Sequence, residues 1–596
     1  MLETAVFLGL SLAAWITIVT VVGLFLVLLL TPIPEDIAFL VAISILGLTG
    51  VLTEKEALSG FSASSVVVVA VLFVVVAGLI HTGVVKWIMA TFLGTPKSYP
   101  VAIVRLMAIV ATLSSVLSNT TVVALFVQVV KQWADKLGIK PSKLLIPLSY
   151  ASGMGGVCTL IGTPPNLIIS GLYAQETGRV MDFFATLIPG LVCLIVGIIS
   201  VLAMRRLLPE RQSPEEAFSQ PSEYTVELLV PADNPHIGET VEQAGLNGVP
   251  GSHLIELIRF DREILSPVPS DEPIMGGDRL VYAGMINNII AMRAQKGLVN
   301  ADHPVFSVDE LDRHRRLRMA YVQRNCELTR KPISQTTLER DYQMSLVAVA
   351  RQGKQIKQSP RNIRLHVGDS LLLECSSRSS RKDTIPGLQF SDASDVIPEY
   401  GVKTAISTLI LVAMVALSSF NVLTLLQSAV LAAGAMLLFC CCSPAQAMRS
   451  INWNILMVFA GSVVIGNAIE KTGIASILAD GVMDLCGGKP LLVMTMMCLT
   501  ATFVTEFISN TAAGAIFFPI VYHAAVSMGC DPYPFLIALM VAVSSSFATP
   551  IGSPTHLLVY GPGGYRFSDF LRIGIPMNLI ILTANLLIVN QMFPLQ

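Results

Sequence analysis

Charged side chains are scarce in this chain. Asp, Glu, Lys and Arg make up 13% of its 596 residues, whereas apolar types make up 53% and the mean hydropathy is +0.68. A soluble globular domain usually carries about 25% charged residues. The composition therefore excludes an ordinary soluble protein. Apolar runs at 15–30 and 66–79 are long enough to span, or nearly span, a lipid bilayer.

Several functional classes leave no signature. The ten cysteines form no Cys-x-x-Cys pair and no disulfide-like framework, so we expect buried packing residues. No nucleophile with a matching base and no metal-ligand spacing occur, which disfavours an enzyme. The first apolar run, at about 5–30, lacks a basic leader and a small-residue cleavage site, so we interpret it as a retained span. We expect no nucleic-acid partner.

The charges that are present are concentrated in one stretch. Of 39 Lys and Arg residues, 24 fall between Arg205 and Lys382, where no long apolar run occurs. This pattern predicts a soluble domain inserted between two membrane halves. The expected units are a first membrane repeat at 1–205, soluble lobes at 206–310 and 311–395, and a second membrane repeat at 396–596.

Three motifs occur twice with nearly the same offset. The pairs are Ser-Asn-Thr at 118–120 and 509–511, Gly-Thr-Pro-Pro-Asn at 162–166 with Gly-Ser-Pro-Thr-His at 552–556, and Thr-Gly at 82–83 and 472–473. The first pair is 391 residues apart and the other two are 390 apart. One offset at three places indicates two copies of one membrane unit, which is how many transporters are built.

We expect each half to contain five membrane crossings and one re-entrant hairpin. The expected crossings are 8–30, 35–52, 63–88, 141–173 and 184–204, then 403–421, 423–441, 452–470, 533–562 and 571–593, with hairpins at 100–133 and 488–525. The apolar arms around the first Ser-Asn-Thr look too short for two comfortable spans, so a hairpin fits better. Five is an odd number, so the second copy must be inverted. The predicted fold is a polytopic α-helical membrane protein with two inverted repeats.

Basic residues in the short loops predict the orientation. With the insert in the cytoplasm, 13 Lys and Arg residues fall in inner loops and four in outer loops. This asymmetry predicts a multi-pass protein of the plasma (inner) membrane, embedded in lipid, with both termini outside. The first hairpin then opens from the cytoplasm and the second from outside.

The soluble insert is itself duplicated. The stretch 254–259 resembles 345–351, and each is followed by a Gly-Asp before an apolar strand, at Gly277-Asp278 and Gly368-Asp369. Short alternating strands and few helices predict two small α+β lobes. The lobes contain no glycine-rich phosphate loop and no catalytic cluster. Inert assembly and ligand sensing stay equally open as their role.

The motifs place polar groups at membrane depth, where they need a partner or a cavity. Helix ends at a hairpin tip leave free carbonyl and N–H groups. Carbonyl, hydroxyl and amide oxygens suit a small hard cation such as Na⁺, and helix starts suit an anion. Gly162 permits close approach, and Pro164 and Pro165 keep the broken helix from re-forming. Ser114 and Thr505 each lie four residues before a motif serine, which predicts a further hydroxyl on the same helical face.

Two titratable residues lie within the predicted site segments. Glu506 is the acid there, and proton transfer, tuning of a cation site, local pairing and exposure to solvent all stay open. His556 replaces the asparagine of the first copy, and we interpret it as a core histidine. The purely structural alternative is that the Ser, Asn and Thr residues only hydrogen-bond neighbouring helices together. Two matched copies with broken helices disfavour that alternative.

These motifs are similar to those of the divalent-anion/sodium symporter family, whose members carry paired Ser-Asn-Thr motifs followed by Thr-Pro motifs. The resemblance covers both membrane halves and implies an elevator-type symporter, usually a homodimer, whose hairpins and broken helices move against a fixed scaffold. It implies two sodium sites, at Ser114, Ser118, Asn119 and Gly162 and at Thr505, Ser509, Asn510 and Gly552. The implied anion contacts are Asn119, Thr120, Thr163 and Pro164 with Asn510, Thr511, Ser553 and Pro554.

Two departures bear on the substrate. The second copy reads Gly-Ser-Pro-Thr-His where family members often have Thr-Pro-Pro. The insert resembles the paired RCK-C (TrkA-C) lobes of potassium-channel regulators, and family members with such lobes resemble bacterial and algal sulfate transporters. The resemblance implies sodium-coupled sulfate import and a nucleotide-like ligand of the lobes. Dicarboxylate or citrate uptake, Na⁺/H⁺ antiport through an acid such as Glu506, and a membrane-anchored sensor are the alternatives.

Overall fold

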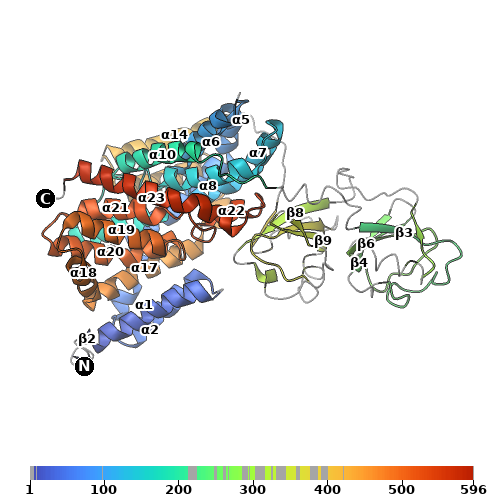
Figure 1. The fold of residues 1–596 in the computed structure, drawn as a ribbon, viewed down its shortest axis with the longest axis horizontal. Helices are drawn as coiled ribbons and strands as arrows, with labels where there is room; N and C mark the ends of the chain where they lie inside the picture. Colours follow the sequence, from blue (N-terminus) through green and yellow to red (C-terminus); the bar gives the residue numbers. More distant parts are fainter. Residues whose placement is uncertain are drawn as a thin grey trace.

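The computed structural model describes most of the chain. It covers residues 6–7, 10–31, 33–96, 98–211, 225–246, 252–259, 263–265, 268–284, 293, 296–301, 316–323, 326–329, 338, 342, 344–352, 354–356, 363–375, 385, 387–390, 401–420 and 422–594. The helices of both ends of the chain form one body, and the strands of the insert form two lobes beside it (Figure 1).

The first half is a series of apolar helices. They are α1 Leu12–Leu30, α2 Glu35–Leu48, α3 Glu54–Ser59, α4 Ser64–His81, α5 Val84–Leu93, α6 Tyr99–Ser114, α7 Asn119–Lys136, α8 Ser142–Gly156, α9 Pro164–Thr177 and α10 Leu187–Ala203. A hairpin of β1 Val6–Phe7 and β2 Leu10–Ser11 precedes them, and a short 3-10 turn, η1 Gly60–Ser62, follows α3. Helices satisfy their backbone hydrogen bonds internally, as a bilayer requires.

The second half repeats this order. Its helices are α14 Val402–Ser419, α15 Leu425–Leu438, α16 Pro444–Ser450, α17 Trp453–Lys471, α18 Ile474–Leu485, α19 Pro490–Val504, α20 Asn510–Ser527, α21 Pro532–Ser544, α22 Pro554–Tyr560 and α23 Phe567–Met592. Helices α2 and α15 begin 390 residues apart, at Glu35 and Leu425, and α7 and α20 begin 391 apart, at Asn119 and Asn510. The helical framework therefore follows the same offset as the motifs.

Four helical stretches of the described residues are long and apolar enough to cross a membrane. They are Glu54–His81, Val402–Ser419, Trp453–Lys471 and Phe567–Met592. The pair Ile474–Leu485 and Pro490–Val504, bent by 117°, is a candidate fifth. The expected crossing 63–88 is wrong in one respect, because α4 ends at His81 and a new helix begins at Val84. Gly83 between them has φ = 79°, a left-handed conformation that ends the helix.

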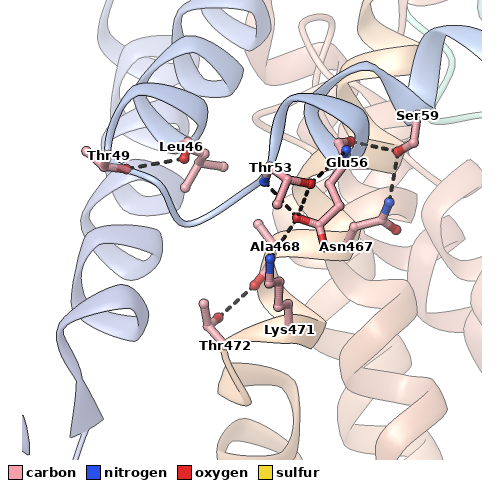
Figure 2. Close-up of polar contacts among 9 residues, drawn as sticks. All are labelled: Leu46, Thr49, Thr53, Glu56, Ser59, Asn467, Ala468, Lys471 and Thr472. Atoms are coloured by element: carbon pink, nitrogen blue, oxygen red, sulfur yellow. Dashed lines mark hydrogen bonds and ion pairs between the residues drawn. The ribbon is translucent and has the colours of Figure 1, made fainter. Parts of the chain in front are cut away.

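Helices from the two halves pack against each other. Helix α2 packs on α17, α4 on α15, α7 on α22, α9 on α20, and α10 on α23. Figure 2 shows one joint, where Thr53 and Glu56 cap the start of α3 and Lys471 Nζ of α17 lies 2.7 Å from Glu56 Oε2. Beside it, Asn467 Nδ2 donates to Ser59 Oγ at 3.2 Å. The two halves are therefore one packed unit.

The insert forms two sheets of the same topology. The first has the order β5-β4-β6-β3-β7 and the second β10-β9-β11-β8-β12. Their strands are β3 Thr225–Leu229, β4 Ser252–Arg259, β5 Glu263–Leu265, β6 Arg279–Gly284 and β7 Val299–Asn300, then β8 Arg316–Val322, β9 Met344–Arg351, β10 Lys354–Gln355, β11 Ser370–Cys375 and β12 Leu388–Phe390. All pairings between these strands are antiparallel.

The same kind of ion pair, with a buried aspartate, occurs in both lobes. Arg259 Nε and Nη2 each lie 3.0 Å from the carboxylate of Asp278, and Arg351 makes the same pair of contacts with Asp369 at 2.7 and 2.8 Å. These hydrogen bonds raise the pKa of both guanidinium groups. Each Asp follows the glycine of a Gly-Asp motif. The motif pair seen in the sequence therefore marks equivalent positions in the two sheets.

The second lobe contacts the helical body. Lys131 Nζ of α7 donates to the Tyr321 hydroxyl of β8 at 2.8 Å. A Cβ placed on Gly368 would lie 2.5 Å from the Tyr560 ring at the end of α22, so this glycine turn rests on the ring. Further along, Arg211, which follows α10, makes a bidentate ion pair with Asp569 of α23, with contacts of 2.6 and 3.0 Å. The insert therefore contacts the helical body through side chains as well as through its two chain connections.

Candidate functional site

The hairpin tips and the helix breaks face each other in both halves. In the first half, residues 115–118, the tip of the expected hairpin, connect α6 to α7, and residues 157–163 separate α8 from α9. In the second half, residues 505–509 separate α19 from α20, and 545–553 separate α21 from α22. Pro164 and Pro554 occupy the first positions of their helices, where proline's missing N–H is not needed.

Asn119 is the centre of the first cluster. Its amide nitrogen, oriented toward the surrounding acceptors, donates to Ser152 O and Gly162 O at 3.1 Å each and to Ser114 Oγ at 2.6 Å. Ser114 Oγ lies 2.9 Å from Ser152 Oγ. The cluster therefore joins the end of α6, the start of α7, the middle of α8 and the break. It contains three of the four residues expected at the first cation site: Ser114, Asn119 and Gly162.

Two glycines make room for the Asn119 amide. A Cβ at Gly156 would lie 2.3 Å from that amide, and a Cβ at Gly162 would lie 2.4 Å from Gly156 O. Such distances are far shorter than a van der Waals contact. A larger residue at Gly156 would therefore displace the Asn119 amide, and one at Gly162 would push the break away from the end of α8.

Thr159 ties the first break to the hairpin. Its hydroxyl donates to Ser115 O and accepts a hydrogen bond from Gly162 N at 3.2 Å. Asn166, fully buried in α9, donates from Nδ2 to Thr159 O at 2.9 Å. Its Oδ1 has no hydrogen-bond partner among the described residues. A buried acceptor of this kind is a candidate ligand for a cation or an ordered water.

Asn510 is the centre of the second cluster. Thr505 Oγ1 lies 2.8 Å from Asn510 Oδ1 and 2.9 Å from Val543 O. Ser546 Oγ lies 3.2 Å from Asn510 Oδ1 and 3.4 Å from Gly552 O. The arrangement again joins the end of one hairpin helix, the start of the next and the break. Thr505, Asn510 and Gly552, which we expected to share a cation site, are therefore brought together.

The hydroxyl bridge of the first break recurs in the second. Thr549 Oγ1 donates to Glu506 O at 2.7 Å and accepts from Gly552 N at 3.0 Å. Thr549 follows Thr159 by 390 residues, so the offset extends to this threonine as well. Both breaks are held to their hairpins by the same kind of bond.

Glu506 lies inside the second cluster. Its side chain is 5% exposed, so exposure to solvent, one of the options left open by the sequence, is wrong. Oε1 accepts from Ala548 N at 2.8 Å and from Asn578 Nδ2 at 2.6 Å, and Oε2 accepts from Thr549 N at 2.7 Å. The carboxylate thus joins the second hairpin to the break and to α23.

The motif serines differ from expectation. We expected Ser118 to share a helical face with Ser114, but α6 ends at Ser114 and Ser118 precedes the first residue of the next helix. The Ser118 hydroxyl instead caps α7, accepting from Thr121 N at 3.4 Å, and Ser509 caps α20, accepting from Ala512 N at 3.3 Å. The caps fix where each helix begins. Their side-chain oxygens are therefore engaged locally.

His556 is a core histidine, as interpreted from the sequence. Its side chain is 1% exposed, with Nε2 2.7 Å from Ser546 O and Nδ1 3.1 Å from Ser149 Oγ of α8. Nearby, the Tyr150 hydroxyl donates to Phe547 O at 2.8 Å. Helix α8 of the first half therefore supports the break of the second half.

The expected anion contacts differ in accessibility. Thr120 and Pro554 are exposed, and Thr163 is 2% exposed. Partly exposed members of the set are Asn119, Pro164, Asn510, Thr511 and Ser553. Most of this set is therefore open to a ligand at the starts of α7, α9, α20 and α22. Because α7 packs on α22 and α20 on α9, each hairpin helix lies against the broken helix of the other half.

Sequence reasoning missed several supporting residues. Thr159 and Thr549 were detectable, since they repeat with the offset of 390 residues. Ser152, Ser546 and Tyr150 were not detectable, because their role depends on which helices lie together. Serine and tyrosine in an apolar helix give no such signal by themselves.

Comparison with known proteins identifies the family. The sequence matches the family described as "Citrate transporter" (CitMHS) over residues 25–484 and 429–595. The chain belongs to this citrate transporter family. It is 30% identical over 611 residues to the uncharacterised transporter sll0640 of Synechocystis, covering 98% of this chain and 97% of that one.

Two further proteins are similar to this member of the citrate transporter family. "Probable sodium/sulfate cotransporter 3" of Chlamydomonas reinhardtii is 22% identical over 788 residues, covering 96% of this chain and 87% of that one. The solved YdaH transporter of Alcanivorax borkumensis is 12% identical, with a TM-score of 0.46 over 97% of this chain and 98% of that one.

The family assignment establishes the broad class. The chain is a multi-pass membrane transporter, with apolar helices long enough to cross a membrane. The expected membership of the wider group of divalent-anion/sodium symporters is confirmed at this coarser level.

Proposed function

We propose that this protein is a sodium-coupled symporter that imports a divalent oxyanion, with sulfate as the first candidate. The observation that carries the proposal is the matched pair of clusters, each joining a hairpin tip to a helix break through an asparagine and a threonine hydroxyl. Matched polar clusters at broken helices are typical of the ion and substrate sites of secondary transporters.

The cation sites follow from the oxygens in each cluster. Na⁺ takes oxygen ligands, as other hard cations do. The first site uses the Ser114 hydroxyl and the main-chain oxygen of Gly162, both positioned by the Asn119 amide, together with the main chain at Ser118. The second uses Thr505, Asn510 and Gly552, with the main chain at Ser509.

The anion lies between the helix starts. Its binding groups are Thr120 and Thr511 of the hairpins, Thr163 and Ser553 of the breaks, and the amides of the two motif asparagines. Within the site segments 114–120, 157–166, 505–511 and 545–556 the sequence has no Lys or Arg. An anion held only by dipoles and hydroxyls gains affinity from a bound cation nearby, which couples the two substrates.

Transport proceeds by an elevator movement of inverted repeats. The two hairpins and broken helices move together, because α7 packs on α22 and α20 on α9 across the repeats. The remaining helices form the scaffold of a homodimer in the inner membrane. The insert lies in the cytoplasm and both termini lie outside.

A second candidate cargo is citrate or a C4-dicarboxylate. The description of the matching family as a citrate transporter favours it. It requires the same cation sites and a larger anion site, so the two candidates differ only in cargo.

Uptake into proteoliposomes tests the proposal. The purified full-length protein is given radiolabelled sulfate with and without an inward Na⁺ gradient, and succinate or citrate is added in excess. Sodium-dependent sulfate uptake that neither carboxylate blocks supports sulfate as the cargo. Competition by citrate or succinate supports the second candidate. Absence of any sodium-dependent uptake of the three anions would contradict the proposed function.

The two soluble lobes regulate this transport through a small ligand. They resemble RCK-C lobes, and a nucleotide-like anion binding between protomers is the expected effector. Support comes from the contact of the second lobe with α7 and α22, the helices that begin at the two clusters. Deleting about residues 215–390 should abolish the response of uptake to the effector. Unchanged flux and unchanged response to every metabolite tested would contradict this role.

A further inference from the structure

The two clusters differ in one charged group. At the position of Glu506 the first half has Ser115, since 506 minus 391 is 115. The Ser115 hydroxyl donates to Thr112 O at 2.8 Å, back toward the end of α6 and outside the cluster. The Glu506 carboxylate instead enters the second cluster. One site segment thus contains a carboxylate and its counterpart is neutral.

The carboxylate is not needed for the hydroxyl bridge. Thr159 bridges Ser115 O and Gly162 N in the first half without any acid. Thr549 bridges Glu506 O and Gly552 N in the second half through the main chain of Glu506. The shared bridge is therefore built from main-chain atoms and a threonine. The acidic side chain of Glu506 therefore has a role that has no counterpart in the first half.

The contacts of Glu506 are those of a carboxylate anion. Three N–H groups donate to its two oxygens, from Ala548, Thr549 and Asn578. Among the described residues no Lys, Arg or His forms an ion pair with it. The carboxylate therefore has neutral donors around it and no counter-charge among the described residues.

That charge lies beside the proposed second cation site. A Cβ placed on Gly552 would lie 3.1 Å from Glu506 Oε2 and 3.1 Å from Thr505 O. Gly552 and Thr505 are both members of the cation site, and Thr505 is the neighbour of Glu506 in the chain. In a partly buried environment a nearby fixed charge acts strongly on a cation.

We propose that Glu506 is a specificity-determining residue that makes the two cation sites unequal. Its charge gives the second site, at Thr505, Asn510 and Gly552, a higher sodium affinity than the first site, at Ser114, Asn119 and Gly162. The second site therefore binds Na⁺ before the first site does, and this bound Na⁺ increases the affinity of the anion site. This inference rests on the proposed sodium-coupled function.

The test measures sodium dependence in the full-length protein. Wild type and Glu506→Gln are reconstituted, and the K0.5 for Na⁺ is measured at saturating anion, then the KM for anion at saturating Na⁺. Glu506→Gln should raise the K0.5 for Na⁺ by about tenfold or more while the anion KM at saturating Na⁺ changes by about twofold or less. Ser115→Ala, the matched change in the first half, should leave the K0.5 for Na⁺ within about twofold.

Two variants of Asn578 distinguish the effect of the Glu506 charge from the effect of the hydrogen bonds that hold its carboxylate. Asn578→Ala removes a donor to Glu506 but keeps the charge, so the K0.5 for Na⁺ should change little. Asn578→Lys places a cation against the carboxylate and should raise the K0.5 as Glu506→Gln does. Asn578→Lys also tests the effect of the Glu506 charge on sodium affinity if Glu506→Gln does not fold.

The outcomes are distinguishable from failure of the proposed function. A wild-type protein without sodium-dependent uptake would contradict the proposed function itself. Sodium-dependent wild type with an unchanged K0.5 in Glu506→Gln would overturn the inference. Equal effects of Glu506→Gln and Asn578→Ala would also overturn it, because the loss would then come from a hydrogen bond and not from charge.

Discussion

At the residue scale, the proposed transport function depends on two asparagine amides. Asn119 and Asn510 each connect a hairpin tip to a helix break, so replacing either one removes that connection and a residue of a proposed cation site. We expect Asn119→Ala and Asn510→Ala each to abolish coupled uptake while the protein stays folded and dimeric. Radiolabelled uptake and size-exclusion chromatography measure the two properties.

A third asparagine provides the control. Asn467 also donates a hydrogen bond between two elements, to Ser59 Oγ at 3.2 Å, but it lies at the joint of α3 and α17 (Figure 2). Asn467→Ala should keep uptake within about threefold of wild type, since isolated polar contacts contribute little. Wild-type flux in the Asn119 or Asn510 variant would show that these motifs are not the transport site.

Gly156 is the second prediction at this scale. A Cβ there would lie 2.3 Å from the Asn119 amide, so Gly156→Ala must displace that amide. We expect loss of sodium-dependent uptake of about tenfold or more. A Cβ on Gly153, one turn earlier in α8, would make only ordinary contacts, at 3.6 Å to the Phe547 ring and 3.9 Å to Ser544 O. Gly153→Ala should therefore transport nearly normally, and equal losses in both variants would refute the packing argument.

The sequence was informative about residues wherever the motif repeats. It predicted Asn119, Asn510, Gly162 and Gly552 as site residues, and each lies in a cluster. It did not predict that the motif serines would be helix caps. A cap depends on the conformation where a helix begins, which the four-residue spacing does not specify.

At the element scale, close approach of helices holds the two halves together. Gly60 in η1 lies against α17, where a Cβ would be 2.0 Å from Ala460 O. Gly60→Ala should lower the free energy of unfolding by about 1–3 kcal/mol, because the backbone of α17 cannot yield as a flexible side chain would. Thermal unfolding of the purified protein measures the change.

Gly47 of α2 is the matched control for that prediction. A Cβ there would meet only the Cβ of Ala57 at 3.9 Å. Gly47→Ala should leave stability unchanged or raise it by about 1 kcal/mol, since alanine favours a helix over glycine. If Gly60→Ala is equally stable, the close packing of η1 on α17 is not a stabilising contact.

The sequence predicted the ends of helices best where a proline or a capping residue marks the boundary. The breaks before Pro164 and Pro554 were predicted, and the break at Gly83 within the expected crossing 63–88 was missed. An apolar run of that length reads as one span, and a single glycine in it does not show by itself whether the helix ends.

At the scale of the whole molecule, one glycine turn of the second lobe lies against the helical body. Gly368 has φ = +89°, and a Cβ on it would lie 2.5 Å from the Tyr560 ring of α22. Gly368→Ala should therefore disturb the contact of the second lobe with α22 and change the uptake rate by about threefold or more. Uptake at saturating substrate measures this.

The duplicated lobe supplies its own control. Gly277 occupies the matching turn of the first lobe, with φ = +90°, and nothing lies within 4 Å of a Cβ there. Both substitutions strain a glycine turn equally, so only the contact with α22 differs. Gly277→Ala should leave uptake unchanged. The same response in both variants would contradict coupling of the second lobe to transport.

The sequence by itself determined the apolar segments, the inserted lobes and the offset of 390 residues, because these follow from composition and local pattern. Only the tertiary structure decided which groups meet. Tyr150 reaches Phe547 O across 397 residues, and Glu506 reaches Asn578 across 72. Such bonds depend on how the helices pack, and hydrophobic burial fixes that packing without recording it in any local motif.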